Sequence, residues 1–177
     1  NRIKKDETWR RFKDSKLNEN MLFNVCYFEE GYKMEESWYR QIGSDLPTHI
    51  GFYKNGNLEY EKWWKNNRIH RDKNHLPASI VYYENKNGNI KFEAWFEDGL
   101  LIKSTKRYEN GILKHEAIYQ NEDAKKITVY FESGAIKDET WYDGNNYHNI
   151  MENDNPAFIS YYDSGKPNII GSLKCKS

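Results

Sequence analysis

Short runs of β-branched and aromatic residues alternate with polar residues along this chain, and most runs end at a turn that contains glycine. Segment 80–83 (Ile-Val-Tyr-Tyr) is typical of a strand that enters such a turn, and segment 58–64 alternates as a returning strand does. The Asn55-Gly56 dipeptide between two such segments predicts a two-residue hairpin turn in which both residues have positive φ. The pattern predicts β-hairpins, and only the charged segment 8–20 has room for a turn or two of helix.

The hairpin pattern is an internal repeat. A pair of aromatic residues precedes a glycine in most copies, Arg107-Tyr108 precedes it in one, and successive second rings are 25, 30, 25, 23 and 31 residues apart. The glycines are Gly31, Gly56, Gly88, Gly111, Gly134 and Gly165. Five residues after the first five of them the chain has Glu36, Glu61, Glu93, Glu116 and Glu139, and seven residues after them it has Trp38, Trp63, Trp95, Ile118 and Trp141. Repetition at about 20 to 50 residues is typical of arrays in which each unit is stabilised by its neighbours.

The connections between copies repeat as well. Pro47, Pro77 and Pro156 each lie six residues before a second aromatic residue, and we expect them in the loop before the next strand because proline cannot donate a ladder hydrogen bond. Segment 6–9 (Asp-Glu-Thr-Trp) is identical to segment 138–141, which indicates that the chain begins inside a further copy. We therefore predict an all-β repeat array of antiparallel β-hairpins, in an elongated, twisted, solenoid-like sheet.

The repeated unit, Tyr-Tyr-x-x-Gly-x-Leu/Ile-x-x-Glu-x-Trp-Tyr-x-x-Gly, resembles the MORN-type repeat in the variant of bacterial antitoxin-like MORN proteins, over about residues 27–165. The connector at 70–83 is similar to repeats in proteins of giant amoeba-infecting DNA viruses. We divide the chain into a partial N-terminal repeat and connector (1–24) and a single array of about six MORN-like hairpin units (25–177). The resemblance implies twisted hairpin arrays used as scaffolds, dimerisation surfaces or junction modules. The second half of the unit here is polar and charged rather than rich in glycine, which departs from the commonest form.

Composition excludes several classes of protein. Lysine plus arginine equals aspartate plus glutamate at 27 each, and a neutral chain lacks the cationic excess that nucleic acids and anionic membranes require. The two cysteines, Cys26 and Cys175, form neither a disulfide framework nor a zinc module, which favours a reducing compartment. No apolar run approaches the roughly 18 residues of a spanning helix. We expect an intracellular or virion location, and no integral membrane protein.

Candidate catalytic and metal-binding groups favour a structural interpretation. The repeated glutamates have nearly the same environment in each copy, whereas acid–base catalysis needs carboxylates whose environments differ. We expect each glutamate to cap a backbone group, to accept from a tyrosine hydroxyl or to pair with a lysine or arginine of the next copy. His70 and His75 have no recurring third ligand beside them, so we predict no metal and no cofactor. No phosphate-binding or nucleophile motif occurs, and we predict that the protein is not an enzyme.

The repeated tryptophans are the candidate binding residues, and two interpretations stay open. They form either a buried ladder in which each ring packs on the preceding copy, or an exposed stripe suited to a peptide, a protein or a glycan. Ile118 at the same offset in one copy favours packing, because isoleucine fills space but is a poor stacking platform. The candidates are Trp38, Trp63, Trp95 and Trp141.

These observations lead to one principal hypothesis and two alternatives. The principal hypothesis is a non-enzymatic repeat scaffold for protein–protein interaction or self-assembly, with a virion or other structural component as the specific expectation. The first alternative is an antitoxin or immunity-like inhibitor that binds a protein partner through its aromatic face. The second is a glycan-binding module. Neither a nucleic acid nor a membrane is an expected partner.

Overall fold

The computed structural model describes residues 5–8, 21–39, 45–71, 76–85, 87–120, 123–142 and 156–171. Within these ranges the chain forms strands and no helix. The helical turns expected at 8–20 fall on residues outside the described ranges, apart from Thr8 at the end of a strand. The strands are β1 (Lys5–Thr8), β2 (Met21–Tyr27), β3 (Lys33–Tyr39), β4 (His49–Phe52), β5 (Leu58–Lys62), β6 (Trp64–Lys65), β7 (Arg68–Ile69), β8 (Ser79–Tyr82), β9 (Ile90–Glu97), β10 (Leu100–Arg107), β11 (Leu113–Gln120), β12 (Asp123–Tyr130), β13 (Ile136–Trp141), β14 (Phe158–Tyr161) and β15 (Pro167–Gly171).

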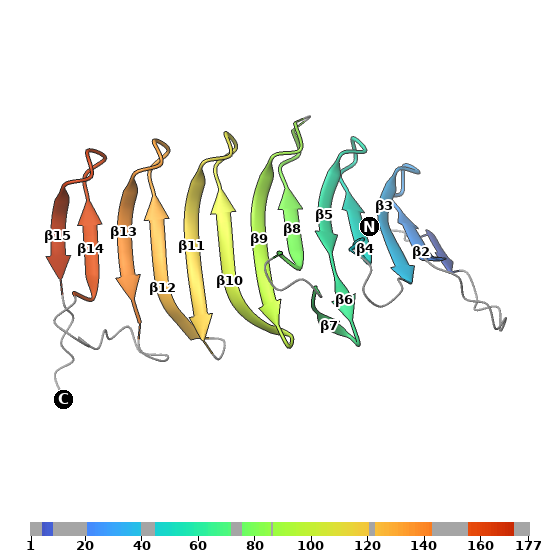
Figure 1. The fold of residues 1–177 in the computed structure, drawn as a ribbon. Coiled ribbons are helices and arrows are strands. Elements are labelled where there is room, and N and C mark those ends of the chain that lie inside the picture. The colour runs from blue at the N-terminus through green and yellow to red at the C-terminus, as the bar shows by residue number, and fades with distance from the viewer. Residues whose placement is uncertain are drawn as a thin grey trace.

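The strands form one long antiparallel sheet. Its 13 strands follow chain order from β1 to β15, except that β6 and β7 leave the sheet and pair with each other, so that β5 pairs with β8. Figure 1 shows the strands side by side in a single layer, with the glycine-containing turns inside the copies along one side, the β9–β10 and β6–β7 turns along the other, and β15 at the opposite end from β1 and β2. The predicted all-β array of antiparallel hairpins is confirmed, and the copies lie edge to edge in an open sheet.

The turn inside each copy differs from the two-residue type expected from Asn55-Gly56. Only the glycine is left-handed there (φ 84°), and Asn55 is not among the described residues with positive φ. Tyr53 N donates to Asn57 O and Gly56 N donates to Tyr53 O, both at 2.9 Å, which is a three-residue loop with a glycine bulge. The two-residue prediction is therefore wrong. The Asn55 side chain accepts from Asn57 N (2.9 Å), and this local bond stabilises the longer turn.

True two-residue turns occur at the other ends of the strands. Asp98 and Gly99 between β9 and β10 have φ of 49° and 83°, and Asn66 and Asn67 between β6 and β7 have φ of 50° and 61°. Asp98-Gly99 ends its unit as the sequence predicts. Asparagine, aspartate and glycine tolerate the left-handed region better than other residues, which explains their use at these four positions.

The prolines lie in the connections, as expected. Pro47, Pro77 and Pro156 each lie two residues before the first residue of a strand, and the ladder continues across the residue that follows each proline. Trp63 N donates to Ala78 O (2.9 Å) and Trp141 N donates to Ala157 O (3.0 Å). The connection is therefore held to the preceding strand by the backbone of the tryptophan position itself.

The core is thin because the described residues form a single layer. Its buried apolar members are mainly small: Val25, Cys26, Trp63, Ala78, Ala94, Ala117 and Ala157. Side chains also meet across neighbouring strands; the Tyr119 hydroxyl on β11, for example, lies 3.3 Å from Ser104 Oγ on β10. Burial arises where side chains of neighbouring strands cover one another across the sheet. Each hairpin therefore depends on the hairpins beside it.

Candidate functional site

The repeated glutamates form a single row across one face of the sheet, which we call the glutamate face. Cross-strand register places each glutamate opposite a β-branched residue on both neighbouring strands. Glu93 on β9, for example, lies opposite Ile80 on β8 and Thr105 on β10. The row consists of Val25, Glu36, Ile50, Glu61, Ile80, Glu93, Thr105, Glu116, Thr128, Glu139, Ile159 and Ile170.

Three of these glutamates accept hydrogen bonds from the next copy. The Tyr82 hydroxyl donates to Glu61 Oε2 at 2.6 Å, and the Tyr161 hydroxyl donates to Glu139 Oε2 at 2.9 Å. Each of these tyrosines is the first of its aromatic pair. Burial and the Glu61 carboxylate raise the pKa of Tyr82, which keeps its hydroxyl protonated as a donor. These bonds join the glutamate of one hairpin to the aromatic pair of the following hairpin.

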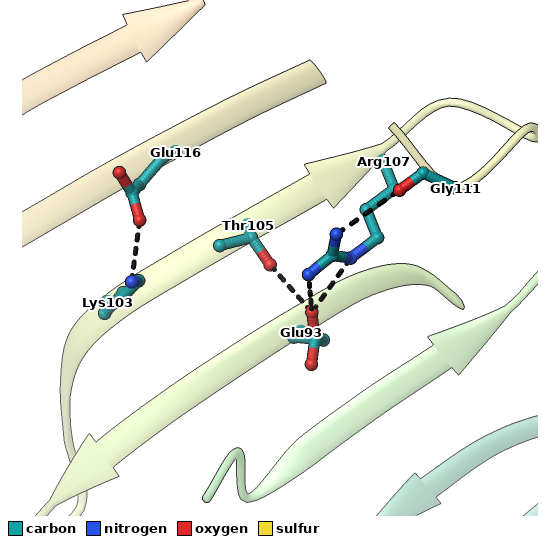
Figure 2. A network of polar contacts seen from close by, with 6 residues as sticks. All are labelled: Glu93, Lys103, Thr105, Arg107, Gly111 and Glu116. Atoms are coloured by element: carbon teal, nitrogen blue, oxygen red, sulfur yellow. Dashed lines mark hydrogen bonds and ion pairs between the residues drawn. The ribbon is translucent and has the colours of Figure 1, made fainter. Parts of the chain in front are cut away.

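The third link uses an arginine where other copies have a ring. Arg107 donates through Nε and Nη2 to Glu93 Oε2 (both 3.2 Å), and the Thr105 hydroxyl donates to the same oxygen at 3.2 Å. Arg107 Nη1 also donates to Gly111 O at 3.3 Å (Figure 2). Glu93 is buried, and a buried carboxylate is costly unless hydrogen-bond donors such as these compensate its charge. Sequence reasoning treated Arg107 only as a lost ring; its place in the pair was the signal for this role.

In three hairpins a lysine also pairs with the glutamate of its own hairpin. Lys103 on β10 pairs with Glu116 at 2.6 Å (Figure 2), and Lys126 on β12 pairs with Glu139 at 2.7 Å. Lys33 pairs with Glu36 at 2.6 Å. The expectation that the glutamates accept from tyrosine hydroxyls or pair with lysine and arginine of a neighbouring copy is confirmed for the Tyr82, Tyr161 and Arg107 contacts. The arrangement is an ionic and hydrogen-bonding ladder that ties hairpins together.

In three consecutive copies the second ring forms another ladder, which sequence reasoning missed. The Tyr53 hydroxyl donates to Tyr82 O (2.8 Å), the Tyr83 hydroxyl to Arg107 O (2.7 Å), and the Tyr108 hydroxyl to Tyr130 O (2.9 Å). Each bond therefore runs to the main chain of the next copy at the position of its first ring. The signal was present in the sequence, because the second position is tyrosine rather than phenylalanine in these three consecutive copies.

The candidate tryptophans lie near cations or carboxylates of the protein. Trp63 is buried, with the Arg71 guanidinium 3.9 Å from its ring centroid and its Nε1 donating to Asp45 O at 2.9 Å. The other three are half-buried. Trp38 Nε1 donates to Glu36 Oε2 (3.1 Å), Lys103 Nζ lies 5.3 Å from the Trp95 ring, and Lys126 Nζ lies 5.0 Å from the Trp141 ring. Their role in binding a ligand stays a prediction.

The register relates Trp95, Ile118 and Trp141 as one row. Trp95 lies opposite Lys103, Lys103 opposite Ile118, Ile118 opposite Lys126, and Lys126 opposite Trp141. The lysines therefore alternate with Trp95, Ile118 and Trp141, and their ammonium groups lie within the distance of about 6 Å from the tryptophan ring centroids that is usual for cation–π contacts. The predicted common offset thus corresponds to a common line on the glutamate face for these residues.

Histidines and acidic residues do not gather into a metal centre in the part of the chain that the structure describes. His49 packs its ring against Trp64 with centroids 5.9 Å apart, and burial lowers its pKa. Burial and the Lys106 charge lower the pKa of His115. His75 and His148 lie outside the described residues. No helix in the described ranges has the length and apolarity to cross a bilayer.

Comparison with known proteins adds no family or relative. No family model matches the chain, and no curated protein matches it.

Proposed function

We propose that the protein is a non-enzymatic repeat scaffold that binds a partner protein or assembles through the ends of its sheet. The observation that carries this proposal is the open single layer. In the described residues β1 and β15 each pair with one other strand, and β15 exposes Ile169 and Ile170 on its two faces. An exposed strand edge beside apolar side chains is a ready template for pairing with another chain.

The glutamate face supports a scaffold because three of its carboxylates, those of Glu61, Glu93 and Glu139, are engaged in contacts between hairpins. The same contacts serve rigidity, since a tyrosine or arginine of one copy is fixed to a glutamate of the preceding copy. The similarity of the connector at 70–83 to giant-virus repeats makes a virion or other intracellular structural assembly our proposed setting.

An antitoxin or immunity-like inhibitor is the alternative that uses the same surfaces. A protein partner fits better than a glycan, because cations lie over the Trp63, Trp95 and Trp141 rings where a sugar would stack. Rescue of toxin-expressing cells by this chain would favour the inhibitor over the scaffold.

Light scattering after size exclusion, combined with a pull-down from the native source, tests the proposal. We expect self-association or a specific protein partner, weakened about ten-fold by Ile170→Lys because a charge on an edge strand blocks pairing. Ile136→Lys, which changes an exposed isoleucine on a strand with neighbours on both sides, is the matched control and should have no effect. A monomer that captures no protein would contradict the proposal.

A further inference from the structure

The repeat is interrupted between β5 and β8, and this interruption creates a feature that other described copies do not share. The β6–β7 hairpin leaves the main sheet and lies beside the turn that joins β9 to β10 (Figure 1). Two tight turns thus meet, Asn66-Asn67 and Asp98-Gly99. A hollow lies on each side of the contact between them.

Arg68 forms the contact between the two turns. Its stem lies over Gly99, where an added Cβ would be 3.0 Å from Arg68 Cδ, and its Nη1 donates to Asp98 O at 3.3 Å. Glycine is therefore needed at this position both for its φ of 83° and for the closeness of the arginine. The two hairpins are fitted to each other, so the hollows are built into the fold.

The first hollow has apolar walls. It has a volume of about 530 Å³ and is lined by Trp64, Ile69, Phe96 and Leu100 together with Arg68 and the Asp98-Gly99 turn. Two contacts hold Trp64 in place. Its backbone N donates to Thr48 Oγ1 at 2.9 Å, and its ring packs against the His49 ring. Trp64 and Leu100 are nevertheless 39% and 44% exposed. A volume of this size accommodates one or two large apolar side chains.

The second hollow is polar and shares Arg68, Asp98 and Gly99 with the first. It has a volume of about 430 Å³, and Lys65, Asn66 and His70 complete its lining. Its charged lining residues are Lys65, Arg68 and Asp98. The Arg68 bond described above goes to a neutral carbonyl, and a guanidinium in that position binds carboxylates well.

We propose that this double hollow binds a short extended segment of a partner protein, in which a large apolar side chain stands beside a carboxylate. The apolar side chain enters the Trp64–Leu100 hollow, and the carboxylate meets the Arg68 guanidinium in the polar hollow. The inference rests on the proposed function as a protein-binding scaffold and names the chemistry of one partner segment. The site lies away from the sheet edges at β1 and β15, so it does not depend on assembly through them.

A displayed library of random short peptides, panned against the full chain, tests this inference. We expect the enriched peptides to combine an aromatic or large aliphatic residue with aspartate or glutamate. Leu100→Asp should weaken their binding about ten-fold, because it places a charge in the apolar hollow and repels the carboxylate. Arg68→Gln should weaken binding by a similar factor, while keeping part of the stem over Gly99. Ile118→Asp is the matched control, since Ile118 is 43% exposed on another part of the sheet, and should change binding less than two-fold.

Circular dichroism and thermal unfolding of each variant confirm that it is folded before its binding is compared. No enrichment, a basic or purely polar peptide pool, or equal binding by Leu100→Asp would overturn the inference. Self-association that Leu100→Asp abolishes would also overturn it, in favour of a second copy of the chain as the occupant. A partner captured in the pull-down and unaffected by Leu100→Asp would leave the scaffold proposal standing while this site falls.

Discussion

Hairpins in the middle of the sheet and the hairpin at its C-terminal end share one pattern but differ in what their residues contact. Ala94 on β9 and Ala117 on β11 are 2% and 0% exposed, whereas Ile169 and Ile170 on β15 are 56% and 64% exposed. Small alanines are thus buried while large isoleucines are not. The difference follows from neighbours, because β9 and β11 have a strand on each side and β15 pairs only with β14 among the described residues. Flanking strands cover the small alanines of the interior, whereas a large side chain on the same strand, Ile118 on β11, is still 43% exposed.

The same contrast holds along the glutamate row. Glu93 is buried and bonded by Thr105 and Arg107, while Ile170, five residues after the last glycine of the repeat, stands exposed in the corresponding place. Inside the row, Glu93 is stabilised by hydrogen-bond donors from the adjacent strand. At the end of the row, Ile170 stays exposed to solvent, so burial stabilises the fold little there. Substitutions should therefore cost much more in the middle than at the end.

Gly51→Val should give the largest loss of stability. Gly51 on β4 lies under the Tyr60 ring, and an added Cβ would be 2.2 Å from Tyr60 Cε1, so the ring must move. We expect a loss of about 3 kcal/mol, as for overpacking at a closed site. Gly171→Ala at the end of β15 is the control, because nothing lies within 4 Å of its added Cβ. Urea unfolding of both variants measures the difference, and equal losses would contradict the contrast between middle and end.

Glu93→Ala should be the next most costly change. It removes the acceptor of Thr105 and Arg107, and we expect a loss of about 2 kcal/mol because a half-buried guanidinium and a buried hydroxyl lose their partner. Ile170→Ala at the equivalent offset should cost at most about 0.5 kcal/mol, as for an exposed surface residue. A double-mutant cycle with Arg107→Ala measures the coupling. Additive losses in that cycle would show that the Glu93–Arg107 pair does not join the two hairpins.

The repeat offsets predicted much of this architecture. Equal spacing from each glycine to its glutamate gives equal register, so the strands, the turns and the row on one face follow from the sequence. The turn type did not follow, because an asparagine–glycine pair suits both a two-residue turn and a three-residue loop, and a side-chain bond within the turn favours the second.

Other parts depend on contacts between copies that the repeat alone does not specify. Whether a glutamate meets a hydroxyl, a guanidinium or an ammonium depends on which donor the next hairpin holds beside it, as Tyr82 and Arg107 illustrate. The hollow beside Arg68 is even harder to predict from the sequence pattern, since it forms where two non-equivalent turns meet. A site of this kind forms where a copy departs from the repeat, so the repeat pattern alone does not predict it.

Tyr82→Phe should cost about 1 kcal/mol, because the hydroxyl that donates to Glu61 at 2.6 Å is lost between two interior hairpins. Tyr161→Phe removes the equivalent donor to Glu139 at the end hairpin, where Lys126 also pairs with that glutamate, and should cost less. Burial and Glu61 raise the pKa of Tyr82 above that of the unfolded chain. Its contribution is therefore complete below about pH 10 and is lost as pH rises further.

Unfolding of both variants at neutral and alkaline pH measures these effects. The Tyr82→Phe protein should lose less stability than the parent as pH rises above about 10, since it lacks the group that must ionise. An alkaline loss that is the same with and without the Tyr82 hydroxyl would contradict its role as a protonated donor.

Acid should produce the smallest effect, and it should act on the middle of the sheet before the end. Burial and Lys106 lower the pKa of His115 on β11, and its buried Nδ1 has no hydrogen-bond partner among the described residues. A lowered pKa means that the folded state resists protonation, so stability is complete above the usual value of about 6.5 and falls as pH drops below it. His115→Gln should reduce this loss. Segment 156–171 contains no histidine, so amide exchange should accelerate more on β11 than on β14 as the solution is acidified below about pH 6.5. Equal acceleration on both strands, or a loss of stability in acid that His115→Gln leaves unchanged, would contradict the role of His115 in the acid sensitivity of β11.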